Sequence, residues 1–149
     1  MIRIAVQSAP IDLAAEHDRA EAAGAGAVAT FCGLVRADGG TDVLELEHYP
    51  GMTEAMLHGI AEEAMARWQL AGASIVHRVG AMRPGERIVF VATAAAHRRP
   101  ALDACAYLID RLKTDAPFWK REHRPEGATW VEAREADDAA AARWGGAGG

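Results

Sequence analysis

The chain has 149 residues and a formal net charge of −5, from 16 Lys and Arg residues against 21 Asp and Glu residues. This length fits one domain that buries about two-thirds of its unfolded surface, and the net acidity argues against general nucleic-acid binding. Cys32 and Cys105 are too far apart for a CxxC pair, and the six histidines lack metal-ligand spacing, so neither a metal site nor a resident cofactor is expected. No apolar run approaches the roughly 20 residues that span a bilayer, and no signal-peptide pattern opens the sequence, so we expect a soluble cytoplasmic protein without a membrane partner.

The periodicity of apolar residues predicts strands that alternate with helices. Strands are predicted at residues 2–7, 27–35, 43–49, 74–79 and 87–95, and helices at 12–23 and 53–68. Asp12 is the expected N-cap of the first helix. Met56 is expected on the apolar stripe of the second helix.

A third helix is predicted from Pro100, as its first residue, to about Thr114, with Leu102 and Cys105 on its core face. Beyond Pro117 the pattern predicts an extended segment at 118–122, a last strand at 130–133 and a short helix that ends near Trp144. Strands both adjacent and separated by helices indicate one α+β domain over residues 1–144, followed by a disordered glycine-rich tail at 145–149.

The two lysines, Lys113 and Lys120, stand out because the other 14 basic residues are arginine. With 34 alanines, the composition suggests a drift under which a lysine needed only as a surface cation would be replaced by arginine. A lysine amine can lose a proton near neutral pH or form a covalent bond when its surroundings disfavour the charge, whereas arginine cannot. The composition therefore favours a chemical role for these two residues.

Further cations lie at the ends of predicted elements. Arg36 follows a strand, His97, Arg98 and Arg99 precede the Pro100 helix, and Arg121 adjoins Lys120. Helix N-termini and arginines together hold phosphate, so this set predicts a pocket for a small anion. The same residues are also compatible with solvated loop charges and with lysines that answer a helix dipole. Cys32 and Cys105 fall on apolar segments, where buried, unreactive thiols are expected.

Several motifs resemble a known family. They are LEHYPGM at 46–52, IVHRVG at 75–80, His97-Arg98, LKTDAPFWKR at 112–121 and WVEARE at 130–135. From about Gly26 to Trp144 the chain resembles the large, catalytic subunits of molybdopterin synthase, the MoaE family. The resemblance implies an α/β hammerhead-like fold and a sulfurtransferase of molybdenum cofactor biosynthesis, which converts a cyclic pyranopterin monophosphate to molybdopterin.

The resemblance also implies the partners. The sulfur donor is a small ubiquitin-like carrier whose C-terminal Gly-Gly ends as a thiocarboxylate. Two large subunits form a central homodimer, and one carrier at each outer end completes a heterotetramer.

Site residues follow from the same resemblance. Lys113 is implied as the main catalytic residue beside the carrier's C-terminus, and Lys120 as the second catalytic lysine. The implied substrate-binding positions are Leu34, Val35, Arg36, His97, Arg98, Lys113, Lys120, Arg121, Glu122 and, from the other subunit, Arg134. Leu34 departs from the pattern, because related sequences can carry a lysine there. Our hypothesis is that Lys113 performs proton or covalent chemistry while Lys120 orients substrate and stabilises developing charge.

Two other functions remain open at this point. The basic pocket of a non-catalytic binding module would receive an acidic tail or a nucleotide without chemistry. Alternatively, Gly148 and Gly149 would make the chain itself a sulfur carrier, although its body lacks the length and pattern of a small ubiquitin-like fold.

Overall fold

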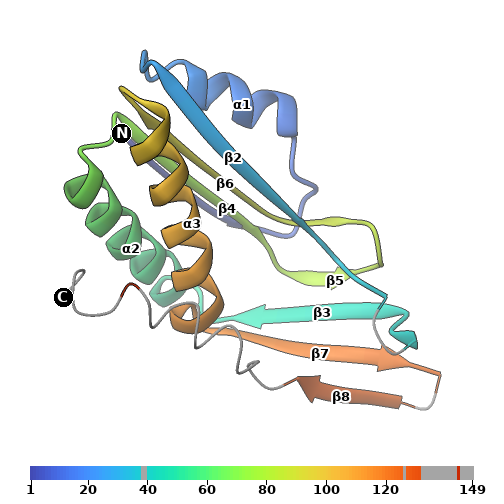
Figure 1. The fold of residues 1–149 in the computed structure, drawn as a ribbon. Helices are drawn as coiled ribbons and strands as arrows, with labels where there is room; N and C mark the ends of the chain where they lie inside the picture. Colours follow the sequence, from blue (N-terminus) through green and yellow to red (C-terminus); the bar gives the residue numbers. More distant parts are fainter. Residues whose placement is uncertain (38–39, 126, 132–143, 145–149) are drawn as a thin grey trace.

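The computed structural model describes residues 1–37, 40–125, 127–131 and 144. Over these residues the chain forms three helices and two four-stranded sheets (Figure 1). The predicted α+β class is confirmed. The single-domain boundary at residue 144 stays a prediction.

The first sheet has the strand order β1-β4-β6-β2. Its strands are β1 (Ile2–Gln7), β4 (Gly72–Arg78), β6 (Arg87–Ala95) and β2 (Ala27–Leu34). β1 runs parallel to β4, and the other two pairings are antiparallel. Every residue of β4 is buried, as expected for an inner strand of a sheet covered on both faces.

Helices cover the two faces of this sheet. They are α1 (Leu13–Glu21), α2 (Met52–Trp68) and α3 (Arg98–Asp115). Ile75 and Val91 pack in one core with residues of α2 and α3, whereas Val76 and Phe90 pack in another with Ala20 of α1. Because successive strand residues point to opposite faces, α1 lies on the face opposite α2 and α3. Asp12 caps α1 as predicted, since its carboxylate accepts a hydrogen bond from the backbone N–H of Ala15.

The second sheet has the order β5-β3-β7-β8 and is antiparallel throughout. Its strands are β5 (Gly80–Met82), β3 (Val43–His48), β7 (Phe118–Arg124) and β8 (Gly127–Val131). Val35, Leu46 and Met82 form a small core beside it. β5 was not predicted, because three residues are too few to show a strand period and pairing with β3 alone defines it.

Three details of the predicted helices are wrong. α3 begins at Arg98 with His97 as its N-cap, so Pro100 is the third helical residue and not the first. Leu102 is 51% exposed, because the buried stripe of α3 runs through neighbouring positions that include Ala101 and Cys105. Met56 is likewise 40% exposed on α2.

Aromatic side chains join α2 to α3. Trp68 meets Tyr107 and Trp144 edge to face, with ring centroids 5.1 and 5.8 Å away. The Trp144 indole N–H donates to a carboxylate oxygen of Asp110 at 2.5 Å. The helix predicted before Trp144, Arg134 and the tail at 145–149 lie outside the described residues. None of the helices in the described part of the chain is long and apolar enough to cross a membrane.

Candidate active site

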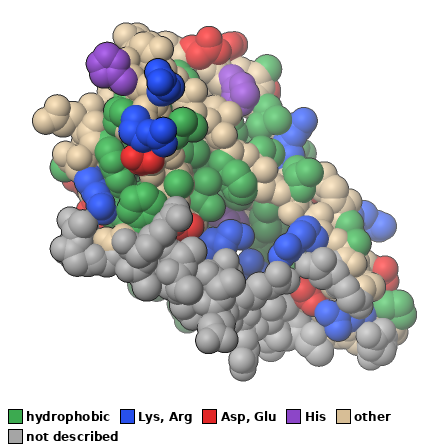
Figure 2. All heavy atoms as spheres, viewed as in Figure 1, with side chains coloured by type: hydrophobic (Ala, Val, Ile, Leu, Met, Phe, Trp, Pro, Cys, Tyr) green, Lys and Arg blue, Asp and Glu red, His purple; other side chains and the backbone are tan. Residues whose placement is uncertain are grey.

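Lys113 and Lys120 line the same cavity, which has a volume of about 90 Å³. Lys113 lies in the last turn of α3 and Lys120 in β7, so the short connection between these elements brings both residues to one cavity, although both are also exposed to solvent. The rest of the wall is formed by Phe31, His77, Ile88, Val89, Val91, Ile109, Leu112, Ala116 and Phe118. Figure 2 shows Lys and Arg side chains gathered beside hydrophobic ones near the middle of this face. The cavity thus combines two cations with a mainly apolar wall.

Local geometry explains which side chains reach the cavity. Ile109, Leu112 and Lys113 are spaced three and four residues apart on α3, so they share one helical face. Phe118 and Lys120 are two residues apart on β7, so they share one side of that strand.

His77 joins the lysines, although the sequence assigned it no role. It is buried in β4, and its ring stacks on Phe118 with centroids 4.0 Å apart and planes tilted by 21°. Burial, and to a smaller extent the nearby charges of Lys120 and Lys113, lower the pKa of His77 from 6.5 to about 4. The ring is therefore neutral at physiological pH. The only available signal was its place in the IVHRVG motif.

Arg36 lies at the same end of the first sheet as the cavity. Leu34, the last residue of β2, pairs with Arg87, and the next residues of β6 line the cavity. Val35 is buried and is held by two backbone hydrogen bonds, from its N–H to the Glu86 carbonyl and from the Gly85 N–H to its own carbonyl. Leu34 and Arg36 are exposed.

Arg121 and Glu122 follow Lys120 in β7 but do not belong to the described cavity wall. Arg121 lies 4.0 Å from the carboxylate of Glu45. Glu122 accepts a hydrogen bond from Arg124 at 2.6 Å. Of the two, only Glu122 shares the strand side of Lys120.

His97 and Arg98 lie at the other end of α3. A helix rises 1.5 Å per residue, which puts Arg98 about 22 Å from Lys113 along the axis. Both residues are exposed, and the His97 side chain makes no capping hydrogen bond. A single chain therefore does not bring His97 and Arg98 to the lysine cavity.

The cysteine thiols are poorly suited to nucleophilic chemistry. Burial raises the pKa of Cys32, and it raises the pKa of Cys105 to about 11. Both thiols therefore stay protonated near neutral pH. Cys105 is buried as predicted, whereas Cys32 is only partly buried. Within the described ranges, no three His, Cys, Asp or Glu side chains are grouped so that they would hold a metal ion.

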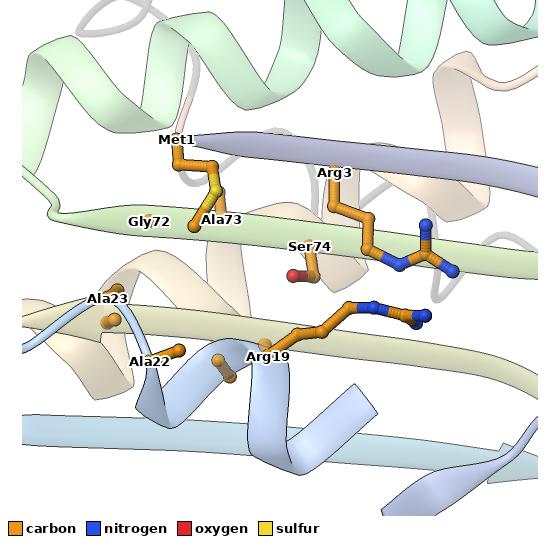
Figure 3. A pocket seen from close by; sticks show the side chains of 11 residues that line it. Met1, Arg3, Arg19, Ala22, Ala23, Gly72, Ala73 and Ser74 are labelled. Atoms are coloured by element: carbon orange, nitrogen blue, oxygen red, sulfur yellow. The ribbon is translucent and has the colours of Figure 1, made fainter. Parts of the chain in front are cut away.

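A second cavity, of about 160 Å³, lies between α1 and the first sheet (Figure 3). Alanines, Gly72 and Met1 form most of its wall. Its two cations, Arg3 and Arg19, both pair with Glu16, at 2.7 and 2.8 Å. The described wall of this second cavity contains no His, Lys, Asp or Glu for acid–base chemistry, so the lysine cavity is the better candidate.

The class of protein follows from these features. An α+β domain whose two lysines line one cavity beside a neutral histidine is compatible with an enzyme that acts on a small anion.

Comparisons with known proteins agree with this class. The family model described as MoaE protein matches residues 6–115. The molybdopterin synthase catalytic subunit of Cereibacter sphaeroides is 51% identical over 146 residues, which cover 96% of this chain and 100% of the relative. The molybdopterin biosynthesis MoaE protein from Burkholderia ambifaria has a solved structure with 49% identity and a TM-score of 0.85, covering 97% of this chain and 99% of that one.

A more distant solved structure shares the fold. It is a complex of subunits 1 and 2 of molybdopterin-converting factor from Helicobacter pylori, 20% identical with a TM-score of 0.74, covering 89% of this chain and 91% of that one. Taken with the two nearer relatives, the family match is decisive: the chain belongs to the MoaE family.

Proposed function

We propose that this chain is the sulfur-transferring subunit that converts a cyclic pyranopterin monophosphate to molybdopterin, with a carrier's C-terminal Gly-Gly thiocarboxylate as the sulfur donor. The observation that carries the proposal is that Lys113 and Lys120 share one cavity. Family membership and the names of the relatives establish an enzymatic role in molybdopterin synthesis. They do not support the alternative of a non-catalytic binding module.

The proposed sulfur transfer gives each of the two lysine amines a role. Sulfur transfer needs a proton donor or acceptor at the pterin oxygen that is displaced, and it needs stabilisation of the anion formed when the thiocarboxylate reacts or its acyl product is hydrolysed. Lys113 performs the proton or covalent step, and Lys120 orients the substrate and stabilises the developing charge. Both lysines are exposed at the cavity, so an entering substrate can reach them.

An exposed apolar surface beside the cavity supports a protein partner. Trp119 precedes Lys120 in β7 and is 39% exposed, and its ring meets that of Tyr49 edge to face at 4.3 Å. Met52 and Met56 of α2 are also exposed. The relative from Helicobacter pylori was solved as a complex of two subunits. We infer that the carrier docks next to Lys120 and that its tail enters the cavity.

The separation of His97 and Arg98 from the lysines supports a homodimer. If both groups bind one pterin phosphate, the N-terminal end of α3 must reach the lysine cavity of a second copy. A symmetric dimer builds two such sites. The contribution of Arg134 across the dimer and the cytoplasmic location stay predictions.

Reconstitution tests the proposed function. The purified chain is mixed with thiocarboxylated carrier and the cyclic pterin, and the dithiolene product is measured by mass spectrometry. We expect product with thiocarboxylated carrier and none with the same carrier ending in an ordinary carboxylate. Binding of both components without product would contradict the proposal. A thiocarboxylate found on Gly149 of the chain itself would instead support the carrier reading.

A further inference from the structure

His77 is the third titratable group of the lysine cavity. Among the described residues of the wall, only His77, Lys113 and Lys120 carry groups that titrate. His77 comes from β4, the inner strand of the first sheet, so its backbone is held on both sides by neighbouring strands. The proposed sulfur transfer assigns roles to Lys113 and Lys120 but none to His77.

One hydrogen bond determines the tautomer of His77. Its Nδ1 lies 2.9 Å from the backbone carbonyl oxygen of Arg78. A carbonyl oxygen only accepts, so Nδ1 carries the proton and donates. Because burial keeps the ring neutral, Nε2 carries a lone pair at the outer edge of the ring.

The ring is stacked on Phe118 and lies within the electrostatic influence of two lysines. Phe118 stacks on the ring and fixes its plane. Lys120 lies on the same side of β7 as Phe118, so one strand segment holds both the stacking partner and the amine. The charged and titratable groups that act on His77 are Lys120, with the larger effect of the two lysines, then Lys113 and His48.

We propose that His77 is a positioning residue for the sulfur transfer: its neutral Nε2 accepts a hydrogen bond from the Lys120 ammonium group and orients that group in the cavity. The proposal rests on the proposed function. A neutral acceptor aligns the amine without adding a third positive charge, whereas an imidazolium would have no lone pair to offer and would repel both lysines.

Two variants that both lose the stacked ring separate the acceptor at Nε2 from the donor at Nδ1. In His77→Asn the amide N–H still donates to the Arg78 carbonyl, but the side chain is too short to place an acceptor at the position of Nε2. In His77→Gln the longer side chain places an amide oxygen there. We expect kcat to fall about 10- to 100-fold in His77→Asn and to stay within about threefold of wild type in His77→Gln, with the KM for the pterin nearly unchanged in both. Equal kcat values for the two variants would overturn the proposal.

Nitrogen-15 NMR of the histidines tests the same contact without activity. In the wild-type chain at pH 7 we expect His77 to be protonated at Nδ1 only, and its Nε2 resonance to move more in Lys120→Met than in Lys113→Met. A proton on Nε2, or a larger effect of Lys113→Met, would overturn the proposal. Wild-type protein that forms no molybdopterin would contradict the proposed function, whereas active wild type with equal Asn and Gln variants would contradict only the role of His77.

Discussion

The two ends of helix α3 both carry exposed cations, but only one of these ends borders the lysine cavity. At its N-terminal end His97, Arg98 and Arg99 are all exposed to solvent. At its C-terminal end Lys113 lines an apolar-walled cavity beside a buried, neutral histidine. A guanidinium is suited to holding an anion, whereas a lysine amine is also capable of proton or covalent chemistry. Under the proposed function, the N-terminal end of α3 is therefore a binding end and the C-terminal end a chemical end.

Helix α3 is rigid, and this determines whether one substrate can contact both of its ends. Eighteen consecutive helical residues hold the two ends apart, so one small substrate cannot touch both ends of the same helix. Either the binding end serves another ligand, or two copies of the chain share each site.

The chemical end should not tolerate arginine. Lys113→Arg keeps the positive charge but removes an amine that can lose its proton, so molybdopterin formation should fall at least about 100-fold. Lys113→Met should be no more active. Carrier binding, measured by calorimetry, should persist in both variants. Near-normal product formation by Lys113→Arg would remove the distinction between the two ends.

The binding end should act in trans. Arg98→Ala should lower kcat/KM about 10- to 100-fold, because a charge-assisted contact with phosphate is lost. Mixed dimers of Arg98→Ala and Lys113→Met chains contain one site with both residues intact if α3 of one copy serves the cavity of the other. Mixing and re-association should then restore up to about a quarter of wild-type activity. No restoration, with mixed dimers verified by native mass spectrometry, would place both ends in separate functions.

Buried His77 should make the chemical end sensitive to acid. Its folded-state pKa of about 4 lies below the usual 6.5, so the unfolded chain binds the proton more tightly. The free energy of unfolding should therefore be unaffected above pH 6.5 and should fall as the pH drops, by about 3 kcal/mol at pH 4. Urea unfolding at several pH values measures this dependence. The His77→Gln variant is the control, and its curve should lack this component.

Arg111, near the C-terminal end of α3, and Arg99, at its N-terminal end, should differ in their contribution to the free energy of unfolding. Arg111 of α3 donates to Glu63 of α2, to Asp115 and to the Tyr107 hydroxyl, and its side chain is 20% exposed. Arg111→Met should lower the free energy of unfolding by about 2 kcal/mol, because Glu63, Asp115 and the Tyr107 hydroxyl each lose one donor, although Glu63 keeps the hydrogen bond from Tyr107. Arg99 is 76% exposed and lies 4.0 Å from Asp103, so Arg99→Gln should change stability by less than about 0.5 kcal/mol. Equal effects in thermal or urea unfolding would show that the network at the C-terminal end contributes little.

Much of the fold could be predicted from the local pattern of residues along the sequence. The strand at residues 2–7, the cap at Asp12 and the end of α3 before Pro117 are set by side chains within a few positions of one another, and the structure has all three. β5 could not be read, because a three-residue strand is defined by its partner β3. The exposure of Leu102 likewise depends on which stripe of α3 the sheet and α2 cover.

The amino-acid sequence alone predicted the alternation of strands and helices, the resemblance to the family and the hypothesis that Lys113 and Lys120 perform chemistry. Their scarcity among basic residues is a property of composition and needs no coordinates. Only the tertiary structure decided that His77 joins these lysines and that His97 and Arg98 do not. The packing of the two sheets brings His77 of β4 against Phe118 of β7, and the length of α3 holds its two ends apart. Contacts between residues so distant in sequence produce no periodic pattern from which they could be predicted.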